Sequence, residues 1–321
     1  MPSVPMALWV GLPWRLPPAH RPPWPSQHAT TMATWWHAPQ WPPQHAHPTG
    51  MLTWLEQNED ANQVSTYLDG LPKPSTTPVI GLTGTGGAGK SCLTDELVRR
   101  FLEEFPQRRV AVVSVDPSKR KTGGALLGDR MRMNAIQHPN VFMRSLATRR
   151  SHLATSESLL PILDLLKASS FDLILVETAG IGQSDTEITD LADLSVYVMT
   201  PEYGASTQLE KIDMIDYADC IVINKFDKPG AEDALDAVRK QYRRSHLKFD
   251  DPVESLPVFG IVANRFNDKG TNWFYFRLLE LLKEKEFVDW TRKSSVSHSV
   301  SQTHELIPAS RKHYLLSLIH I

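Results

Sequence analysis

A glycine-rich segment, residues 84–91, constrains the fold of this chain more than any other feature. It reads Gly-Thr-Gly-Gly-Ala-Gly-Lys-Ser and separates the apolar run Val79–Thr83 from a helical pattern of apolar residues over Ser91–Phe105. Glycines let the backbone curl so that several N–H groups face one point, and a helix that starts there adds the positive end of its dipole. The segment therefore predicts a phosphate-binding loop between a buried strand and a helix.

The segments that follow alternate between strand and helix patterns, and this order predicts the fold class. Strand-like runs lie at Val79–Thr83, Val110–Val115, Leu173–Val176, Ser195–Met199, Cys220–Asn224 and Val258–Ala263. Helical patterns lie at Ser91–Phe105, Glu157–Ala168, Gln208–Tyr217, Ala231–Arg244 and Trp273–Lys283. The alternation predicts an α/β fold of the P-loop NTPase type, a mostly parallel, doubly wound sheet with helices on both faces. Ligands of such sheets bind at the carboxyl ends of the strands.

A second motif, Asn224-Lys225-Phe226-Asp227, ends the strand-like run that begins at Cys220. A carboxylate can accept hydrogen bonds from the N1–H and 2-amino groups of guanine, a pair of donors that adenine lacks. Asp227 therefore predicts selection of GTP over ATP, while Asn224 can bond the base N7 and the loop backbone, and Lys225 can lie over the ring. Four such residues alone often form an ordinary loop, so the position after a P-loop is what favours guanine binding.

Carboxylates at two further strand ends predict a site for Mg²⁺. Glu177 follows the run Leu173–Val176, where many GTPases have Asp, and Asp116 follows Val110–Val115. Mg²⁺ prefers oxygen ligands and keeps several waters, so Glu177 can act directly or through a water. The hydroxyl group of Ser91 is the third predicted ligand.

Other loop residues are candidates for phosphate contacts and catalysis. Lys90 is a mobile charge for the β- and γ-phosphates, and Gly180 can donate a backbone N–H to the γ-phosphate. Arg132 can pair with phosphate or ribose oxygens. No Gln directly follows Gly180, where Ras-like enzymes place their water-orienting residue, so Asp116 and Gln183 are the candidates for that role. A solvated charged loop is the alternative interpretation of the segment after Asp116.

Composition excludes several classes of protein. The 34 Lys and Arg nearly balance the 36 Asp and Glu among 321 residues, which argues against a basic protein that binds nucleic acid. No apolar run approaches the roughly 20 residues of a membrane-spanning helix. The two cysteines, Cys92 and Cys220, both fall inside predicted core elements, so we expect no disulfide framework and a reducing, cytoplasmic compartment.

The two ends of the chain differ in composition from its middle. Residues 1–50 contain 12 of the 24 prolines and 6 of the 9 tryptophans but no Asp or Glu, so we expect a disordered or spurious segment there. The histidines of the same segment leave metal binding as an alternative. We expect a linker with a helix over residues 51–77, a P-loop GTPase domain over 78–290, and a disordered or truncated tail over 291–321.

Three segments, taken in order, resemble a known family. They are VDPSKRKTGGALLGDRMRM at 115–133, ETAGIGQSD at 177–185 and NKFD at 224–227. They resemble the G-protein chaperones of adenosylcobalamin-dependent acyl-CoA mutases, and most nearly the GTPase module inside fused isobutyryl-CoA mutases. The resemblance implies a Mg²⁺-dependent, homodimeric GTPase of the signal-recognition-particle-like class, which gates cofactor loading and protects or reactivates a cobalamin mutase. Adenosylcobalamin would then bind only to the partner mutase, because no Asp-x-His-x-x-Gly motif occurs in this chain.

The motifs and the resemblance together give the predicted site. The residues predicted to bind nucleotide are Gly84, Gly86, Gly87, Ala88, Gly89, Lys90, Ser91, Arg132, Gly180, Asn224, Lys225 and Asp227. The residues predicted to surround Mg²⁺ are Ser91, Asp116, Asp129, Glu177 and Thr178. The residues predicted to act in catalysis are Lys90, Asp116 and Gln183.

Two alternative functions belong to the same fold. One is a nickel-type metallochaperone GTPase, which the histidine-rich start favours. Such a protein needs a Cys/His site at a dimer interface, and the positions of Cys92 and Cys220 inside core elements do not supply one. The other is a transport-system kinase or ATPase, against which Asp227 argues because its carboxylate selects guanine.

Overall fold

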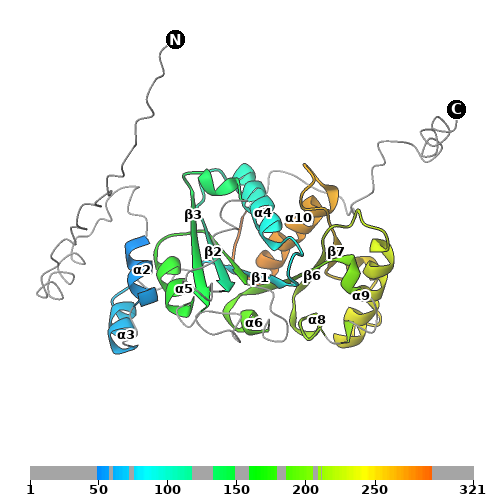
Figure 1. Ribbon diagram of the computed structural model, residues 1–321, viewed down its shortest axis with the longest axis horizontal. Coiled ribbons are helices and arrows are strands. Elements are labelled where there is room, and N and C mark those ends of the chain that lie inside the picture. Colours follow the sequence, from blue (N-terminus) through cyan, green and yellow to red (C-terminus); the bar gives the residue numbers. More distant parts are fainter. Residues whose placement is uncertain are drawn as a thin grey trace, which may run out of the picture. The chain divides into compact units, whose positions relative to one another are not determined.

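Runs of mostly apolar residues form one parallel sheet in the computed structural model (Figure 1). The structure describes residues 49–57, 61–71, 76–117, 133–148, 159–178, 186–204, 209–210 and 212–290, which all belong to one unit of the chain. The strands are β1 Val79–Gly84, β2 Val110–Pro117, β3 Val141–Thr148, β4 Leu173–Thr178, β5 Leu194–Met199, β6 Cys220–Ile223 and β7 Val258–Gly260. These 7 strands take the order β3-β2-β4-β1-β5-β6-β7, and all neighbours are parallel.

Helices cover both faces of this sheet. They are α2 Thr49–Gln57, α3 Ala61–Asp69, α4 Lys90–Glu104, α5 Leu159–Ala168, α6 Glu187–Leu191, α8 Met214–Tyr217, α9 Ala231–Ser245 and α10 Lys269–Glu284. Short 3₁₀ turns lie at Ala135–Gln137, Pro201–Tyr203 and Val253–Ser255. Helices α4 and α10 pack on one face, and α5, α6, α8 and α9 pack on the other (Figure 1).

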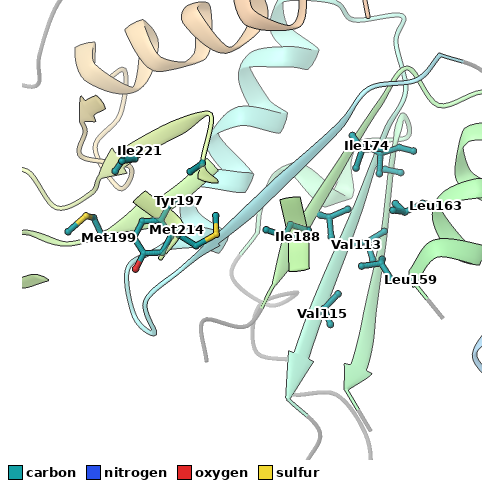
Figure 2. Packing of buried hydrophobic residues seen from close by; sticks show 14 of the residues in the cluster. Val113, Val115, Leu159, Leu163, Ile174, Ile188, Tyr197, Met199, Met214 and Ile221 are labelled. Atoms are coloured by element: carbon teal, nitrogen blue, oxygen red, sulfur yellow. The ribbon is translucent and has the colours of Figure 1, made fainter. Parts of the chain in front are cut away.

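Two apolar cores result, one on each face of the sheet. On one face, Phe101 of α4 and Phe274 of α10 are fully buried against the strands. On the other face, Val113 of β2 packs with Leu159 of α5 and Ile188 of α6 (Figure 2). Because the inner strands are covered on both sides, their sequences are continuous apolar runs rather than alternating ones.

The strand order brings the sequence motifs together. Strand β1 lies in the middle of the sheet, with β4 on one side and β5 on the other, and β6 follows β5. The carboxyl ends of parallel strands lie on the same side of the sheet, so the loops after β1, β4 and β6 emerge near one another. Binding sites of doubly wound sheets form at this edge. The structure thus confirms the predicted fold class.

Two elements were absent from the sequence-based prediction. Strand β3 forms an edge of the sheet, where Arg144 and Ser145 are only partly buried. These two polar residues interrupt the apolar run, so the strand has no clear pattern in the sequence. Helix α6 has only 5 residues, which is too short for a helical period to show.

Several predicted boundaries also shift. Helix α10 begins at Lys269 rather than at Trp273, because the side chain of Asp268 accepts a hydrogen bond from the backbone N–H of Thr271 and caps the helix. Helix α8 begins at Met214, later than predicted, and Gln208 lies outside the described residues.

The segment before β1 contains helices α2 and α3, where a linker with a helix was predicted. The rings of Trp54 and Tyr67 lie 5.2 Å apart, and Arg144 donates a hydrogen bond to the Thr53 hydroxyl at 3.1 Å. The ring contact joins α2 to α3, and the Arg144 bond together with the buried side chains of Leu52 and Leu55 attaches the segment to the face of the sheet that α5 covers. The predictions for residues 1–48 and 291–321 fall outside the described residues. Within the described residues, no helix is both long and apolar enough to cross a bilayer.

Candidate functional site

The glycine-rich loop after β1 has a backbone that only glycine accepts at two positions. Gly84 has φ +141°, and a Cβ atom there would lie 1.8 Å from the carbonyl oxygen of Val198 in the neighbouring strand. Gly89 has φ +91°, and a Cβ atom there would lie 2.4 Å from Nδ2 of Asn224. The loop therefore packs tightly against β5 and against the Asn-Lys-Phe-Asp segment, and helix α4 begins directly after it.

We expect Gly84→Ala to lower the free energy of unfolding by about 2–4 kcal/mol, from backbone strain and overpacking together. Gly86→Ala is the matched control, because a Cβ atom at Gly86 meets nothing within 4 Å. Urea unfolding of the nucleotide-free protein measures both. Equal stability of the two variants would contradict the described geometry of the loop.

Lys90 is the first residue of α4, and its ammonium group folds back over the loop. Its Nζ donates hydrogen bonds to the carbonyl oxygens of Gly84 at 3.0 Å and Thr85 at 3.3 Å. Only 8% of the residue is exposed. The loop thus holds a positive charge at the point where its N–H groups and the helix N-terminus converge, an arrangement that suits an anion.

The Asn-Lys-Phe-Asp segment is joined to the glycine-rich loop by direct hydrogen bonds. Asn224 Nδ2 donates to the carbonyl oxygen of Ala88 at 2.7 Å, and Lys225 Nζ donates to that of Gly87 at 2.7 Å. Lys225 has φ +58°, an unusual conformation for a side-chain-bearing residue. The structure therefore brings together two motifs that the sequence places far apart.

Asp227 ends the same segment and presents its carboxylate to solvent. The residue is exposed, and no described residue donates a hydrogen bond to its side chain. The preceding Phe226 is buried and contacts Gly260 of β7, where a Cβ atom would lie 2.6 Å from the phenyl ring. The backbone of the segment is thus anchored, while the carboxylate is left available for a ligand.

A carboxylate and two hydroxyl groups meet beside the loop. Ser91 Oγ donates to Glu177 Oε1 at 2.7 Å, and Thr94 Oγ1 donates to Glu177 Oε2 at 3.3 Å. Glu177 is 4% exposed and Thr94 is fully buried. Mg²⁺ in phosphate-binding sites takes hard oxygen ligands, often one or two carboxylates with waters and phosphates. The hydroxyl of Ser91 and the carboxylate of Glu177 fit that ion.

The structure does not bring Thr178 beside Ser91. Consecutive strand residues point to opposite faces, so Thr178 faces away from Glu177 and α4. Its buried hydroxyl has no hydrogen-bond partner among the described residues. Among all the described residues, no group of three His, Cys, Asp or Glu side chains lies close enough to hold a metal ion.

The structure does not show where five of the predicted site residues lie relative to the site. Asp116 belongs to β2 by its backbone, but its side chain is outside the description. Asp129, Arg132, Gly180 and Gln183 lie outside the described residues altogether. Their roles remain predictions.

Two residues near the site were not singled out from the sequence. Thr94 lies one turn after Lys90 in α4, and its hydroxyl also donates to the Lys90 carbonyl oxygen at 3.1 Å. Asp268 accepts the N–H of Val262, next to Ala263, whose own N–H donates to Asn224 Oδ1 at 3.0 Å. An Asp just before a helical pattern is a recognisable N-cap signal, whereas a Thr inside a helix carries no such signal.

The chain is similar to known proteins. The family described as methylmalonyl Co-A mutase-associated GTPase MeaB matches residues 51–265. A fused isobutyryl-CoA mutase of Geobacillus kaustophilus is 55% identical over 238 residues, which are 74% of this chain and 22% of that protein. A fused isobutyryl-CoA mutase of Cupriavidus metallidurans is 47% identical over 271 residues, which are 84% of this chain and 25% of that protein. This chain thus spans about a quarter of the length of these relatives.

A solved structure agrees with the fold. The crystal structure of a LAO/AO transport system kinase superposes with a TM-score of 0.52 at 25% identity, covering 74% of this chain and 70% of that chain. The family match covers more than half of the chain, and it includes both the glycine-rich loop and the Asn-Lys-Phe-Asp segment. The chain therefore belongs to the family of methylmalonyl-CoA mutase-associated GTPases, MeaB.

Proposed function

We propose that this chain binds GTP with Mg²⁺ and hydrolyses it, in order to control a cobalamin-dependent acyl-CoA mutase. The observation that carries the proposal is the direct bonding of the base-recognition segment to the phosphate loop. Asn224 bonds to Ala88 and Lys225 bonds to Gly87, both at 2.7 Å. A nucleotide whose phosphates lie on the loop therefore has its base beside Asp227, which offers a carboxylate to the N1–H and 2-amino groups of guanine.

The residues of the phosphate loop supply the charge that hydrolysis requires. Phosphoryl transfer depends mainly on positioning and on stabilising negative charge at the transferred group. Lys90 places a buried ammonium group at the loop, where it can move from the carbonyl oxygens of Gly84 and Thr85 to phosphate oxygens. Ser91 and Glu177 would hold Mg²⁺, which neutralises phosphate charge when bound. Thr94 fixes the second carboxylate oxygen of Glu177.

The partner is proposed from the relatives. Those reported above are fused isobutyryl-CoA mutases, and this chain matches only about a quarter of their length. We infer that the chain acts on an isobutyryl-CoA or methylmalonyl-CoA type mutase, in trans or as fused domains, and gates its cofactor loading or protects it. Adenosylcobalamin then contacts the mutase only, and the GTPase works as a homodimer. Asp116 and Gln183 are the proposed water-positioning residues.

We expect slow GTP hydrolysis by the chain alone and faster hydrolysis when a cognate mutase is added. No water-positioning residue follows Gly180 directly, so we infer that the partner completes the arrangement that positions the attacking water. Glu177→Gln should lower the stimulated turnover roughly 10- to 100-fold, because the amide holds Mg²⁺ and the Ser91 hydroxyl less well than the carboxylate does, and it should lower GTP affinity less than turnover. Steady-state phosphate release with and without mutase measures both.

Glu232→Gln is the matched control, because Glu232 is an exposed glutamate in the first turn of α9. It should leave turnover unchanged. Fast hydrolysis that does not respond to the mutase would contradict the proposed gating. Full activity of Glu177→Gln would contradict the proposed metal site.

A further inference from the structure

A buried carboxylate lies beneath the base-recognition segment. Asp268 is 3% exposed, and its Oδ2 accepts three hydrogen bonds. They come from the N–H of Val262 at 3.1 Å, the N–H of Thr271 at 2.8 Å and the hydroxyl of Thr271 at 2.9 Å. One oxygen therefore caps helix α10 and at the same time holds the loop between β7 and α10.

The residues on either side of Val262 hold the base-recognition segment. The N–H of Ala263 donates to Asn224 Oδ1 at 3.0 Å, and the carbonyl oxygen of Ile261 accepts the N–H of Phe226 at 2.9 Å. Asn224 and Phe226 lie just before Asp227 in the chain. The three-residue segment 261–263 thus bonds to the base-recognition segment through its first and third residues and to Asp268 through its middle one.

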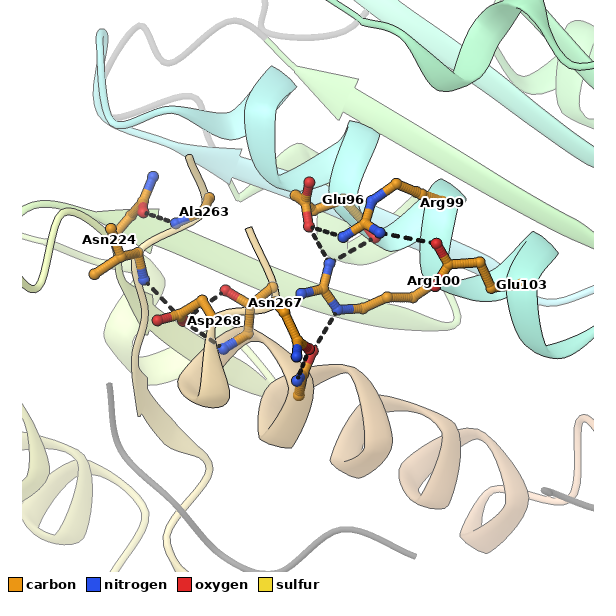
Figure 3. Close-up of polar contacts among 11 residues, drawn as sticks. Glu96, Arg99, Arg100, Glu103, Asn224, Ala263, Asn267 and Asp268 are labelled. Atoms are coloured by element: carbon orange, nitrogen blue, oxygen red, sulfur yellow. Dashed lines mark hydrogen bonds and ion pairs between the residues drawn. The ribbon is translucent and has the colours of Figure 1, made fainter. Parts of the chain in front are cut away.

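The same loop is attached to α4, the helix that begins at the phosphate loop. Arg100 is 7% exposed, and its Nε donates to Asn272 Oδ1 at 2.9 Å. Asn272 Nδ2 donates in turn to Asn267 Oδ1 at 2.8 Å, and Asn267 has φ +51°. Figure 3 shows this polar bridge between α4 and α10, with Asp268, Asn224 and Ala263 at its other end. The loop is therefore fixed from two sides.

We propose that Asp268 is a positioning residue that sets the base specificity of the nucleotide site. The inference rests on the proposed function, because it assigns Asp268 a role in placing Asp227 against guanine. A carboxylate discriminates guanine only if both of its oxygens meet two donors in the plane of the base, so a small shift of the segment removes the discrimination. Asp268 prevents that shift because its bond to the N–H of Val262 fixes the segment 261–263. The bonds that this segment makes to Phe226 and Asn224 are then held in place.

Three substitutions at Asp268 separate this role from helix capping. Asp268→Ala removes all three hydrogen bonds. Asp268→Ser keeps a good N-cap for α10, because Ser ranks with Asp at this position, but its shorter side chain does not reach Val262. Asp268→Asn keeps an oxygen in the same place. If Asp268→Ala fails to fold, Asp268→Ser carries the test by itself.

The experiment measures the affinities of the full chain for GDP, ADP and pyrophosphate by calorimetry, together with thermal unfolding. In the Ala and Ser variants we expect the preference for GDP over ADP to fall about tenfold or more, which corresponds to the loss of one buried hydrogen bond. Pyrophosphate affinity should not change. Asp268→Asn should retain most of the preference for GDP, and Asp268→Ser should be more stable than Asp268→Ala.

Asp219→Ala is the matched control. Asp219 accepts hydrogen bonds from the N–H of Ser195 at 2.8 Å and from the Ser195 hydroxyl at 2.9 Å. It precedes β6, so it lies at the amino ends of the strands, on the side of the sheet away from the nucleotide site. It should lower stability and leave the nucleotide preference unchanged. A wild-type preference retained in the Ala and Ser variants, or lost equally in Asp219→Ala, would overturn the role of Asp268 while the proposed function stands. A wild-type chain that binds GDP no better than ADP would overturn both.

Discussion

Lys90→Ala is expected to reduce GTP affinity roughly 30- to 1,000-fold, because a charge-assisted contact to phosphate is worth about 2–4 kcal/mol. The ammonium group lies over the carbonyl oxygens of Gly84 and Thr85, at the point where the loop and the start of α4 converge. Removing it leaves the phosphates with the backbone N–H groups, the helix dipole and Mg²⁺. Calorimetric titration with GTP measures the loss.

The fold of the variant should survive. Lys90 contacts the loop rather than the apolar cores, which are built from residues such as Phe101 and Phe274. Lys285→Ala is the matched control, because Lys285 Nζ also donates to a backbone carbonyl, that of Asp193 at 2.9 Å, far from the loop. Unchanged GTP affinity of Lys90→Ala, together with an intact thermal transition, would show that Lys90 does not bind the nucleotide.

The central strands and both nucleotide motifs could be predicted because each has a local pattern. Strand β2 is a valine-rich run, and the phosphate loop needs glycine at Gly84 and Gly89 for its own backbone. Strand β3 could not be predicted, because an edge strand needs no apolar run and Arg144 interrupts the pattern. Its place follows only from pairing with β2.

The contacts between motifs could not be predicted, because they depend on the strand order. Asn224 and Ala88 are 136 positions apart, and the sequence shows only that each lies after a predicted strand. The N-cap signal of Asp268 was present and would have moved the start of α10 to Lys269. Its second bond, to the N–H of Val262, has no signal in the sequence, because it depends on how the loop between β7 and α10 folds back on itself.

Asp227→Asn is expected to reverse the base preference of the site from guanine to xanthine. The amide replaces one acceptor with a donor, which suits the C2 carbonyl of xanthine and clashes with the 2-amino group of guanine. Each mispaired buried group costs about 1–3 kcal/mol, so the ratio of GTP to XTP affinity should change on the order of 100-fold or more. Asp233→Asn, an exposed carboxylate in the first turn of α9, is the matched control and should not change the ratio.

Equilibrium competition against a fluorescent nucleoside diphosphate, GDP for the wild-type chain and XDP for Asp227→Asn, most directly tests the central claim that the Asn224–Asp227 segment and the phosphate loop form one guanine-nucleotide site. GTP, XTP and ATP are each titrated into the wild-type chain and into Asp227→Asn with Mg²⁺ present. The wild-type chain should release the probe to GTP and not to ATP or XTP, and the variant should release it to XTP in place of GTP. Equal displacement by GTP and ATP in the wild-type chain, or an unchanged order of competitors in the variant, would contradict the claim.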